Sequence, residues 1–175
     1  GVVHRLDKDT SGLMVVAKSE AIQLSLQSQF KEQSVIKRYT VLVRGHLSPE
    51  RGVIESQIGR PPRNRKRMAV VSRGKEARTL YRVISYYDGY TLLGVTPETG
   101  RTHQIRVHLS AIGHPVIGDA LYGVKSGLLK RQFVHAHLLG FRLPATGEYV
   151  EFRSELPPDL RLMLEHLSYS QLSRE

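Results

Sequence analysis

The side chains best suited to chemistry lie together near the start of the chain, between His4 and Gly12. This segment holds two carboxylates, two cations and two hydroxyl groups, and it runs directly into the apolar residues 13–17. Polar groups at this density before a β-branched run are typical of a loop that carries side chains into a cleft from the edge of a sheet. A polar turn without chemistry is the simpler alternative.

Three kinds of chemistry fit this segment. Asp7, Asp9 and Ser11 match the first, third and fifth oxygen ligands of a calcium loop, with Gly12 at the sixth position. The twelfth position, where such a loop needs a glutamate, is Lys18, which disfavours calcium. A phosphorylated aspartate is a second option. Such an aspartate usually follows a buried strand, whereas the cationic residues before Asp7 indicate a solvated segment. In the third, Asp7 is a nucleophile or base held by a cation elsewhere in the chain.

Composition limits the partners of the protein. A chain of 175 residues with 40% hydrophobic and 24% charged residues is long enough for one domain with a core. Its net charge of +10 indicates a polyanionic partner, most commonly nucleic acid. The sequence has no cysteine, no signal peptide and no apolar run of about 18 residues. We therefore expect a cytoplasmic protein that binds nucleic acid and does not cross a membrane.

The positive charge is concentrated between Arg60 and Arg78, where eight cations face Glu76 alone. Guanidinium groups match phosphate oxygens and release counterions when they bind a nucleic acid. The segment is therefore expected to be an arm that contacts phosphates, and a solvated loop is the alternative. Its central cations, which we expect to bind RNA if RNA is the partner, are Arg63, Arg65, Lys66 and Arg67.

Hydrophobic periodicity predicts the elements that position these residues. A helix is expected over residues 19–33 with Ser19 as its cap, and a second helix is expected from about Thr102. Residues 77–87 and 90–97 read as a hairpin around Asp88-Gly89. The remaining predictions are strand-like residues over 13–17, strands over 35–44, 134–143 and 148–152 and from residue 52, and a closing helix after residue 158. The pattern favours one mixed α+β domain with a mainly antiparallel sheet and a few packed helices.

The second helix places His103 and Arg106 on one side, close to its positive end, where an anion is stabilised. The histidine spacings disfavour a metal site, because none gives the zinc pair four residues apart with a third ligand. The strained Gly-x-Ser-x-Gly turn of a serine hydrolase is also absent. What remains is a set of Asp7, Tyr39 and Arg106 in a basic protein. These side chains could hold an ionised carboxylate and stack on a planar heterocycle.

Four segments in the expected order resemble the signature segments of RluA-type pseudouridine synthases, in particular the RluD-like branch. They are residues 1–13 (GVVHRLDKDTSGL), 37–39 (KRY), 98–108 (ETGRTHQIRVH), and 113–115 (GHP) continuing to Tyr122-Gly123. The resemblance runs from residue 1 to about residue 160. It implies the pseudouridine synthase fold with a central RNA-binding cleft, and a catalytic domain over residues 1–175 that lacks its N-terminal part and the S4 domain often found before it.

The resemblance also implies roles for single residues. Asp7 corresponds to the aspartate that attacks the uridine at C1′ of the ribose or at C6 of the base. Tyr39 corresponds to the tyrosine that stacks on the base and can move the C5 proton, and Arg106 to the cation that pairs with the aspartate. Arg5 corresponds to a residue that fills the gap left by the flipped nucleotide, and Leu139 to an apolar residue of the uracil pocket. Arg101 and His103, from the third segment, are expected to bind RNA.

The implied activity is isomerisation of specific uridines to pseudouridine, with ribosomal RNA of the large subunit favoured and transfer RNA as an alternative substrate. A uridine in folded RNA must leave the base stack before an enzyme can reach its glycosidic bond. No cofactor and no metal is expected, and a monomer is expected. The alternative from another class is a non-catalytic RNA-binding or assembly module that retains the fold.

Overall fold

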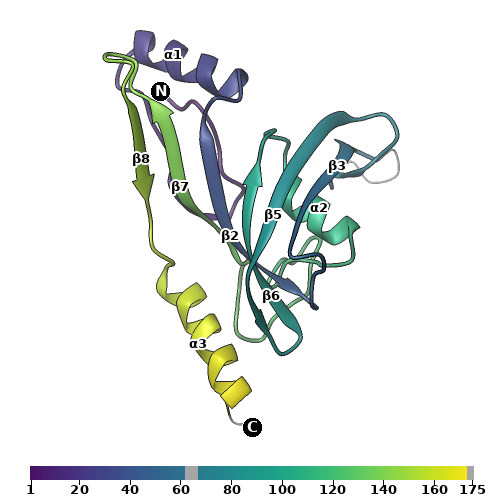
Figure 1. Ribbon diagram of the computed structural model, residues 1–175. Coiled ribbons are helices and arrows are strands. Elements are labelled where there is room, and N and C mark those ends of the chain that lie inside the picture. The colour runs from purple at the N-terminus through teal and green to yellow at the C-terminus, as the bar shows by residue number, and fades with distance from the viewer. Residues whose placement is uncertain (62–66, 173–175) are drawn as a thin grey trace.

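The computed structural model describes residues 1–61 and 67–172 as one curved sheet with three helices (Figure 1). The sheet has eight strands in the order β1-β7-β2-β6-β5-β3-β4, and β8 pairs with the other side of β7. The elements in chain order are β1 (Ser11–Gly12), α1 (Glu20–Lys31), β2 (Ile36–Arg44), β3 (Arg51–Gly59), β4 (Ala69–Val70), β5 (Lys75–Tyr87), β6 (Tyr90–Pro97), α2 (Gln104–Ala111), β7 (Val134–Arg142), β8 (Tyr149–Arg153) and α3 (Pro158–Leu172).

Pairing in the sheet is antiparallel except between β1 and β7. The β5–β6 hairpin turns at Asp88-Gly89, where Gly89 has a φ of 75°. This positive φ is the conformation that favours glycine and that such a tight turn requires. The predicted hairpin and the predicted mixed, mainly antiparallel architecture are therefore confirmed.

Residues 13–17 are not the predicted strand-like run, because only Ser11 and Gly12 join the ladder with β7. Beyond Gly12 the chain pairs instead with its own first residues. The amide of Val15 donates to His4, the amide of Ala17 donates to the carbonyl of Gly1, and Val16 forms a single bridge with Val2. The β-branched residues thus close a loop around residues 4–10 instead of extending the sheet.

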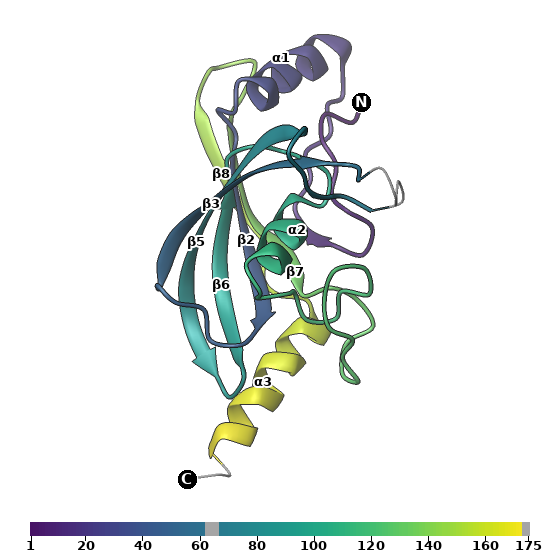
Figure 2. The same ribbon diagram turned by 90° about the vertical axis from the view of Figure 1, so that its right-hand side faces the viewer.

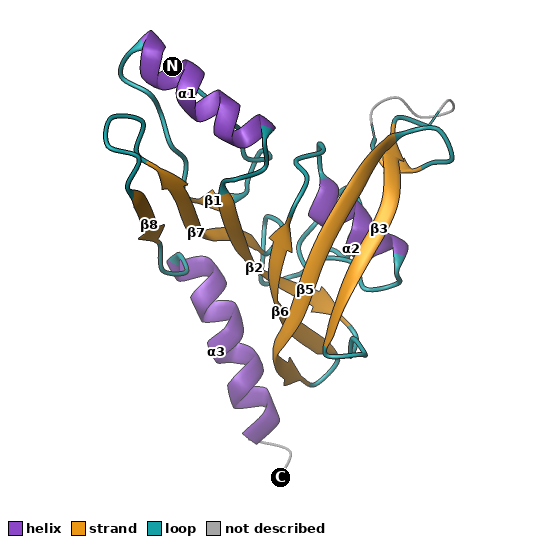
Figure 3. Cartoon of the chain, turned by 45° about the horizontal axis from the view of Figure 1, so that its top comes forward, coloured by secondary structure: helices purple, strands orange, loops and turns teal. Residues whose placement is uncertain are grey.

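The first helix follows the sequence signals closely. Ser19 caps α1 and accepts a hydrogen bond from the amide of Ile22. The apolar side of α1 places Leu26 in a core cluster with Val35 and Phe141, at one end of the sheet. The third helix packs at the other end, where Leu160 belongs to a separate core cluster. Figure 3 shows α1 and α3 at opposite ends of β7.

The second helix lies on one face of the sheet, on the same side as the N-terminal loop (Figure 2). It contacts β3, β4, β5 and β6, and every residue from 104 to 109 is buried. Ile105 and Leu109 form a buried apolar stripe on this helix, whereas Ile112 is exposed and follows its last residue. Val107 is also apolar, but the other buried positions hold the polar residues Gln104, Arg106 and His108, which is unusual for a core helix and marks the functional side of the domain.

In the described parts of the chain, no helix combines the length and the apolar character needed to cross a lipid bilayer.

Candidate active site

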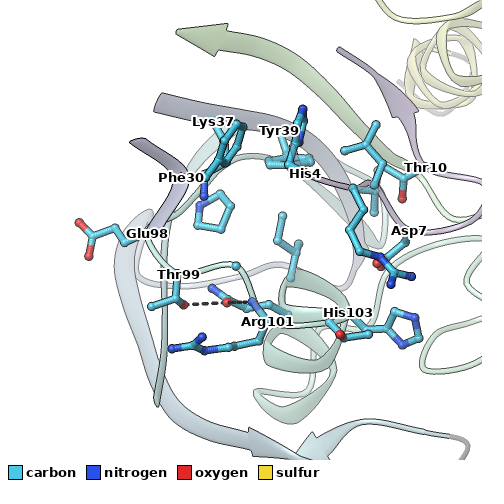
Figure 4. A pocket seen from close by; sticks show the side chains of 18 of the residues that line it. His4, Asp7, Thr10, Phe30, Lys37, Tyr39, Glu98, Thr99, Arg101 and His103 are labelled. Atoms are coloured by element: carbon cyan, nitrogen blue, oxygen red, sulfur yellow. Dashed lines mark hydrogen bonds between the residues drawn. The ribbon is translucent and has the colours of Figure 1, made fainter. Parts of the chain in front are cut away.

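A cavity of about 440 Å³ opens between the N-terminal loop, the end of α1, β2 and the start of α2 (Figure 4). Its volume is in the range of ordinary small-molecule sites. The loop contributes residues 3–7 and Thr10, β2 contributes Lys37 and Tyr39, and the connection into α2 contributes residues 98–103. Segments that are distant in the sequence therefore line one cavity.

Arg106 joins two carboxylates beside this cavity. Its guanidinium donates to Asp119 through Nε at 2.7 Å and through Nη2 at 2.8 Å, and to Asp7 through Nη1 at 3.1 Å. Asp119 is completely buried, whereas the Asp7 side chain is 20% exposed. A bidentate pair of this kind fixes the plane of the guanidinium. Asp119 therefore orients Arg106, and Arg106 in turn holds one oxygen of Asp7 at the edge of the cavity.

Charge and hydrogen bonding keep this network ionised in spite of burial. Burial alone would lower the pKa of Arg106, but its bonds to Asp119 and Asp7 outweigh that effect and raise this pKa above its ordinary value. Burial would likewise raise the pKa of Asp119, yet Arg106 and the amides of Leu121 and Tyr122 hold it below its ordinary value. A buried carboxylate that accepts four hydrogen bonds is a rigid support.

Tyr122 lies beside the same network. The guanidinium of Arg106 lies 5.1 Å and that of Arg67 5.2 Å from the centre of its ring. Its hydroxyl forms hydrogen bonds with Nδ1 of His103 at 2.8 Å and with the amide of Met68 at 2.8 Å. Cations over a tyrosine ring attract its electron-rich face. Tyr122 thus connects Arg67 and Met68 to the start of α2.

His103 occupies the position just before α2 in a left-handed conformation, with a φ of 57°. Burial lowers its pKa, and the charges of Asp7 and Arg106 act on it in opposite directions. A non-glycine residue with positive φ at a cavity wall is held there by its surroundings. The predicted grouping of His103 with Arg106 near the start of the helix is therefore found, although the helix begins at Gln104, after the expected Thr102.

Tyr39 reaches the cavity from the middle of β2, with Val95 and Ala136 as its neighbours on β6 and β7. Burial, together with the charge of Asp7, raises the pKa of Tyr39 to about 12. The side chain is therefore a neutral phenol at physiological pH. It offers an aromatic face and a hydroxyl donor close to the carboxylate of Asp7.

The loop that carries Asp7 is fixed by residues from the start of β7 and the segment before it. Gln132 donates to the carbonyl of Lys8 at 2.6 Å and to the hydroxyl of Thr10 at 3.2 Å. Arg131 donates to the carbonyl of Asp9 at 3.0 Å and to the hydroxyl of Ser11 at 3.1 Å. These bonds set the shape of the loop, so that Asp7 alone of its carboxylates reaches the cavity.

The structure brings most of the predicted site residues together. The cavity is lined by Asp7, Tyr39, Arg106, Arg5, Arg101 and His103. Arg67 lies outside it, against Tyr122 and the carbonyl of Leu121. Arg63, Arg65 and Lys66 fall outside the described residues.

Leu139 does not line the cavity and is a correction to the sequence analysis. It lies opposite Lys37 in the β2–β7 ladder, but its side chain belongs to the core cluster of Leu26 and Phe141 beneath α1. This cluster leaves Leu139 only 4% exposed, which keeps its side chain out of the cavity. Ile105 and Val134 supply apolar surface in the cavity instead.

Sequence reasoning missed several residues of the site. Asp119 and Tyr122 lie in the fourth signature segment, but their type alone gave no reason to place them beneath Arg106. His4, Phe30 and Lys37 also line the cavity. The alternation of Lys37 with Tyr39 along one strand was the available signal for the lysine. Among the described residues, no group of three or more potential ligands could hold a metal ion.

Comparisons with known proteins agree on one family. A family model described as RNA pseudouridylate synthase matches residues 1–111. A protein of Chloroflexus aurantiacus named as an uncharacterized RNA pseudouridine synthase is 48% identical over 95% of this chain and 53% of its own length. The ribosomal large subunit pseudouridine synthase D of Nitrosomonas europaea is 46% identical over 99% of this chain and 54% of its own length.

Solved structures include a similar fold. The human RNA pseudouridylate synthase domain containing 1 matches with a TM-score of 0.78 and 33% identity, over 95% of this chain and 79% of that one. The chain spans about half the length of the curated relatives it matches.

Proposed function

Because the chain belongs to the RNA pseudouridylate synthase family, we propose that it converts uridine in RNA to pseudouridine, with Asp7 as the nucleophile. The observation that carries this proposal is the contact of Asp7 with the buried Arg106 at the edge of a cavity that also receives Tyr39. A carboxylate held by a cation stays ionised and oriented, as a nucleophile must. The catalytic domain proposed here comprises residues 1–175.

The proposed reaction needs no oxidant and no second substrate. In one route, Asp7 attacks C1′ of the ribose while the glycosidic bond breaks and its electron pair moves to the uracil. The freed base turns, C5 bonds to C1′, and the Asp7 carboxylate leaves. The proton on C5 is then lost and a proton is placed on N1. In the other route, Asp7 adds to C6 of the base before the base detaches.

Arg106 and Tyr39 have separate tasks in this proposal. Arg106 keeps Asp7 charged and aimed, and Asp119 fixes Arg106. Tyr39 stacks on the extruded uracil, and its neutral phenol can pass a proton between C5 and N1 only by donating one as it accepts another. A base that has left its stack gains contact with such a ring, which offsets part of the few kcal/mol that extrusion costs.

The substrate is proposed to be ribosomal RNA. Relatives such as the Nitrosomonas europaea protein carry names that refer to the large ribosomal subunit, and the net charge of +10 favours a polyanion. A cytoplasmic location and a monomeric state belong to the same proposal.

The test follows tritium from C5 of uridine into water, since formation of the new C5–C1′ bond requires loss of that atom. Large-subunit ribosomal RNA labelled at C5 is incubated with the 175-residue chain and with Asp7→Asn. We expect Asp7→Asn to reduce tritium release by at least about 10³-fold. We also expect it to change RNA affinity by less than about threefold.

Asp9→Asn is the matched control, because Asp9 lies in the same loop with a φ of 69° and does not line the cavity. Asparagine tolerates this conformation well, and the charge change is identical. Asp9→Asn should release tritium at nearly the wild-type rate. Full activity of Asp7→Asn would refute the assignment of the nucleophile. RNA binding by the wild-type chain without any tritium release would instead favour a non-catalytic RNA-binding module.

A further inference from the structure

Lys37 is a half-buried cation that the chemistry proposed above does not use. It precedes Tyr39 by two residues on β2, so both side chains lie on the same side of the sheet and both line the cavity. Figure 4 shows Lys37 and Phe30 together on one side of the cavity, and Asp7 and His103 on the opposite side. The lysine therefore belongs to a part of the site that is separate from the reacting carboxylate.

The surroundings of Lys37 are apolar on the side of the sheet. Its partner across the ladder is Leu139, which is packed beneath α1 with Leu26 and Val35. Burial lowers the pKa of Lys37.

No anion of the described chain neutralises Lys37. The two acidic residues that line the cavity are engaged elsewhere: Asp7 pairs with Arg106, and Glu98 pairs with Arg78. Lys37 itself makes no hydrogen bond or ion pair with any described residue. A partly buried cation without a counter-charge reduces stability. Such a group is expected where a ligand brings the missing negative charge.

His4 offers a second donor beside Lys37. Its ring stacks on Phe30 with a centroid distance of 4.5 Å, and its Nε2 accepts the amide hydrogen of Val15 at 3.0 Å. Burial, together with the charge of Lys37, lowers the pKa of His4 to about 4. The neutral ring therefore carries its proton on Nδ1, which donates to no described residue. Lys37 and His4 thus provide a cation and a neutral N–H in one wall of the cavity.

Resting on the proposed function, we infer that Lys37 is the principal ligand of a phosphate subsite that binds a phosphodiester of the RNA next to the extruded uridine. Phosphodiesters are the negatively charged groups of RNA, so the group that neutralises Lys37, when a nucleotide has its C1′ at Asp7 and its base against Tyr39, is a phosphodiester near that nucleotide. The ammonium and the phosphate neutralise each other in a partly desolvated site, where a charge-assisted hydrogen bond is strong. The subsite fixes the register of the strand, so that one uridine meets the nucleophile.

The test removes single charges from the RNA and from the protein together. Nine-nucleotide RNAs with one central uridine are prepared, each with one phosphodiester replaced by a neutral methylphosphonate. Dissociation constants are measured by fluorescence anisotropy for Asp7→Asn and for Asp7→Asn with Lys37→Met. The Asp7→Asn background prevents turnover, so binding at the subsite is read independently of catalysis.

We expect one linkage beside the uridine at which the neutral group weakens binding to Asp7→Asn about tenfold. At that linkage the neutral group should weaken RNA binding less than about twofold in the chain that also carries Lys37→Met, because the contact between Lys37 and the phosphodiester is already absent there. Lys37→Arg should keep the tenfold effect. Lys18→Met, which removes an exposed lysine outside the cavity, should keep it too.

In the active chain, Lys37→Met should raise KM about tenfold and change kcat by less than about threefold. Equal sensitivity of both chains at every linkage, or no binding of any of these RNAs, would overturn the subsite. So would a large drop in the melting temperature of Lys37→Met, because loss of an uncompensated cation should not destabilise the fold. If one neutral linkage weakens binding only when Lys37 is present, but the wild-type chain does not isomerise uridine, the proposed function is refuted and the phosphate subsite is retained.

Discussion

Replacement of Asp119 with asparagine keeps the shape of a buried side chain and removes the charge that orients Arg106. The carboxylate has no exposed surface, and its two bonds to the guanidinium measure 2.7 and 2.8 Å. Removing one partner of a buried ion pair typically costs roughly 3–5 kcal/mol. We therefore expect Asp119→Asn to lower the free energy of unfolding by about 3–5 kcal/mol. For a chain of this length the melting temperature should fall by roughly 6–20 °C.

The matched control is Asp159→Asn. Asp159 accepts the same pair of bonds from Arg131, at 2.7 and 2.9 Å, but its side chain is 46% exposed. Exposed ion pairs contribute about 1 kcal/mol or less. Urea denaturation of both variants at pH 7, followed by circular dichroism, measures the two losses. Equal losses would refute the argument that burial, and not hydrogen-bond geometry, makes Asp119 a structural support of the site.

The same pair predicts a dependence on pH. The pKa of Asp119 is lower in the folded chain than in the unfolded chain, so the stability it contributes is present above about pH 4. This contribution is lost as the pH falls through the lower, folded-state value. The difference in stability between the wild-type chain and Asp119→Asn should therefore stay constant from pH 7 to 5 and shrink below pH 4.

Three further measurements address other parts of the structure. Gly12→Ala should lower the free energy of unfolding by roughly 3 kcal/mol or more, because at a φ of 117° its new Cβ would lie 2.3 Å from a carbonyl oxygen of β7. Gly147 has a φ of 72° and open space around it, so Gly147→Ala should cost about 1 kcal/mol in the same denaturation assay. Burial, and in addition the charge of Asp7, raises the pKa of Tyr39 to about 12, so Asp7→Asn should lower this pKa. An unchanged spectrophotometric titration of Tyr39 would show that the Asp7 charge does not act on it. Burial lowers the pKa of His108 to about 4, so its ring should titrate near that value by NMR, and a midpoint near 6.5 would contradict its burial. The free energy of unfolding should fall by roughly 3 kcal/mol between pH 6.5 and 4, because only the unfolded chain takes up the proton in that range.

Local signals in the sequence were enough for the elements that depend on local physics. Ser19 marks the start of α1 through a cap that forms within one turn, and Asp88-Gly89 marks a turn that needs only two residues. Each of these features is determined by neighbours within a few residues.

Long-range features lacked such signals. The parallel contact of β1 with β7 joins residues that are 124 positions apart, and the residues near Ser11 carry no local sequence signal that predicts this pairing. Leu139, which the family resemblance assigned to the uracil pocket, packs in the core cluster beneath α1, and this packing depends on a helix more than 100 residues earlier in the chain. Asp119 looks like an ordinary loop carboxylate, and its role arises only when α2 docks above it with Arg106. Family resemblance supplied Asp7 and Arg106, while the residues that support them emerged from packing.

The contact between β1 and β7 has a consequence for the order in which the protein matures. Ser11 and His135, joined across this contact, are 124 residues apart, and at synthesis rates of about 5–20 residues per second the ribosome needs roughly 6–25 s to make the chain between them. Until this part of the chain emerges, Arg131 and Gln132 are also missing, so the loop with Asp7 lacks the four hydrogen bonds that they donate to it. The residues around Ser11 are therefore made well before the segment that fixes them, and the loop with Asp7 can take its native shape only after β7 has been translated.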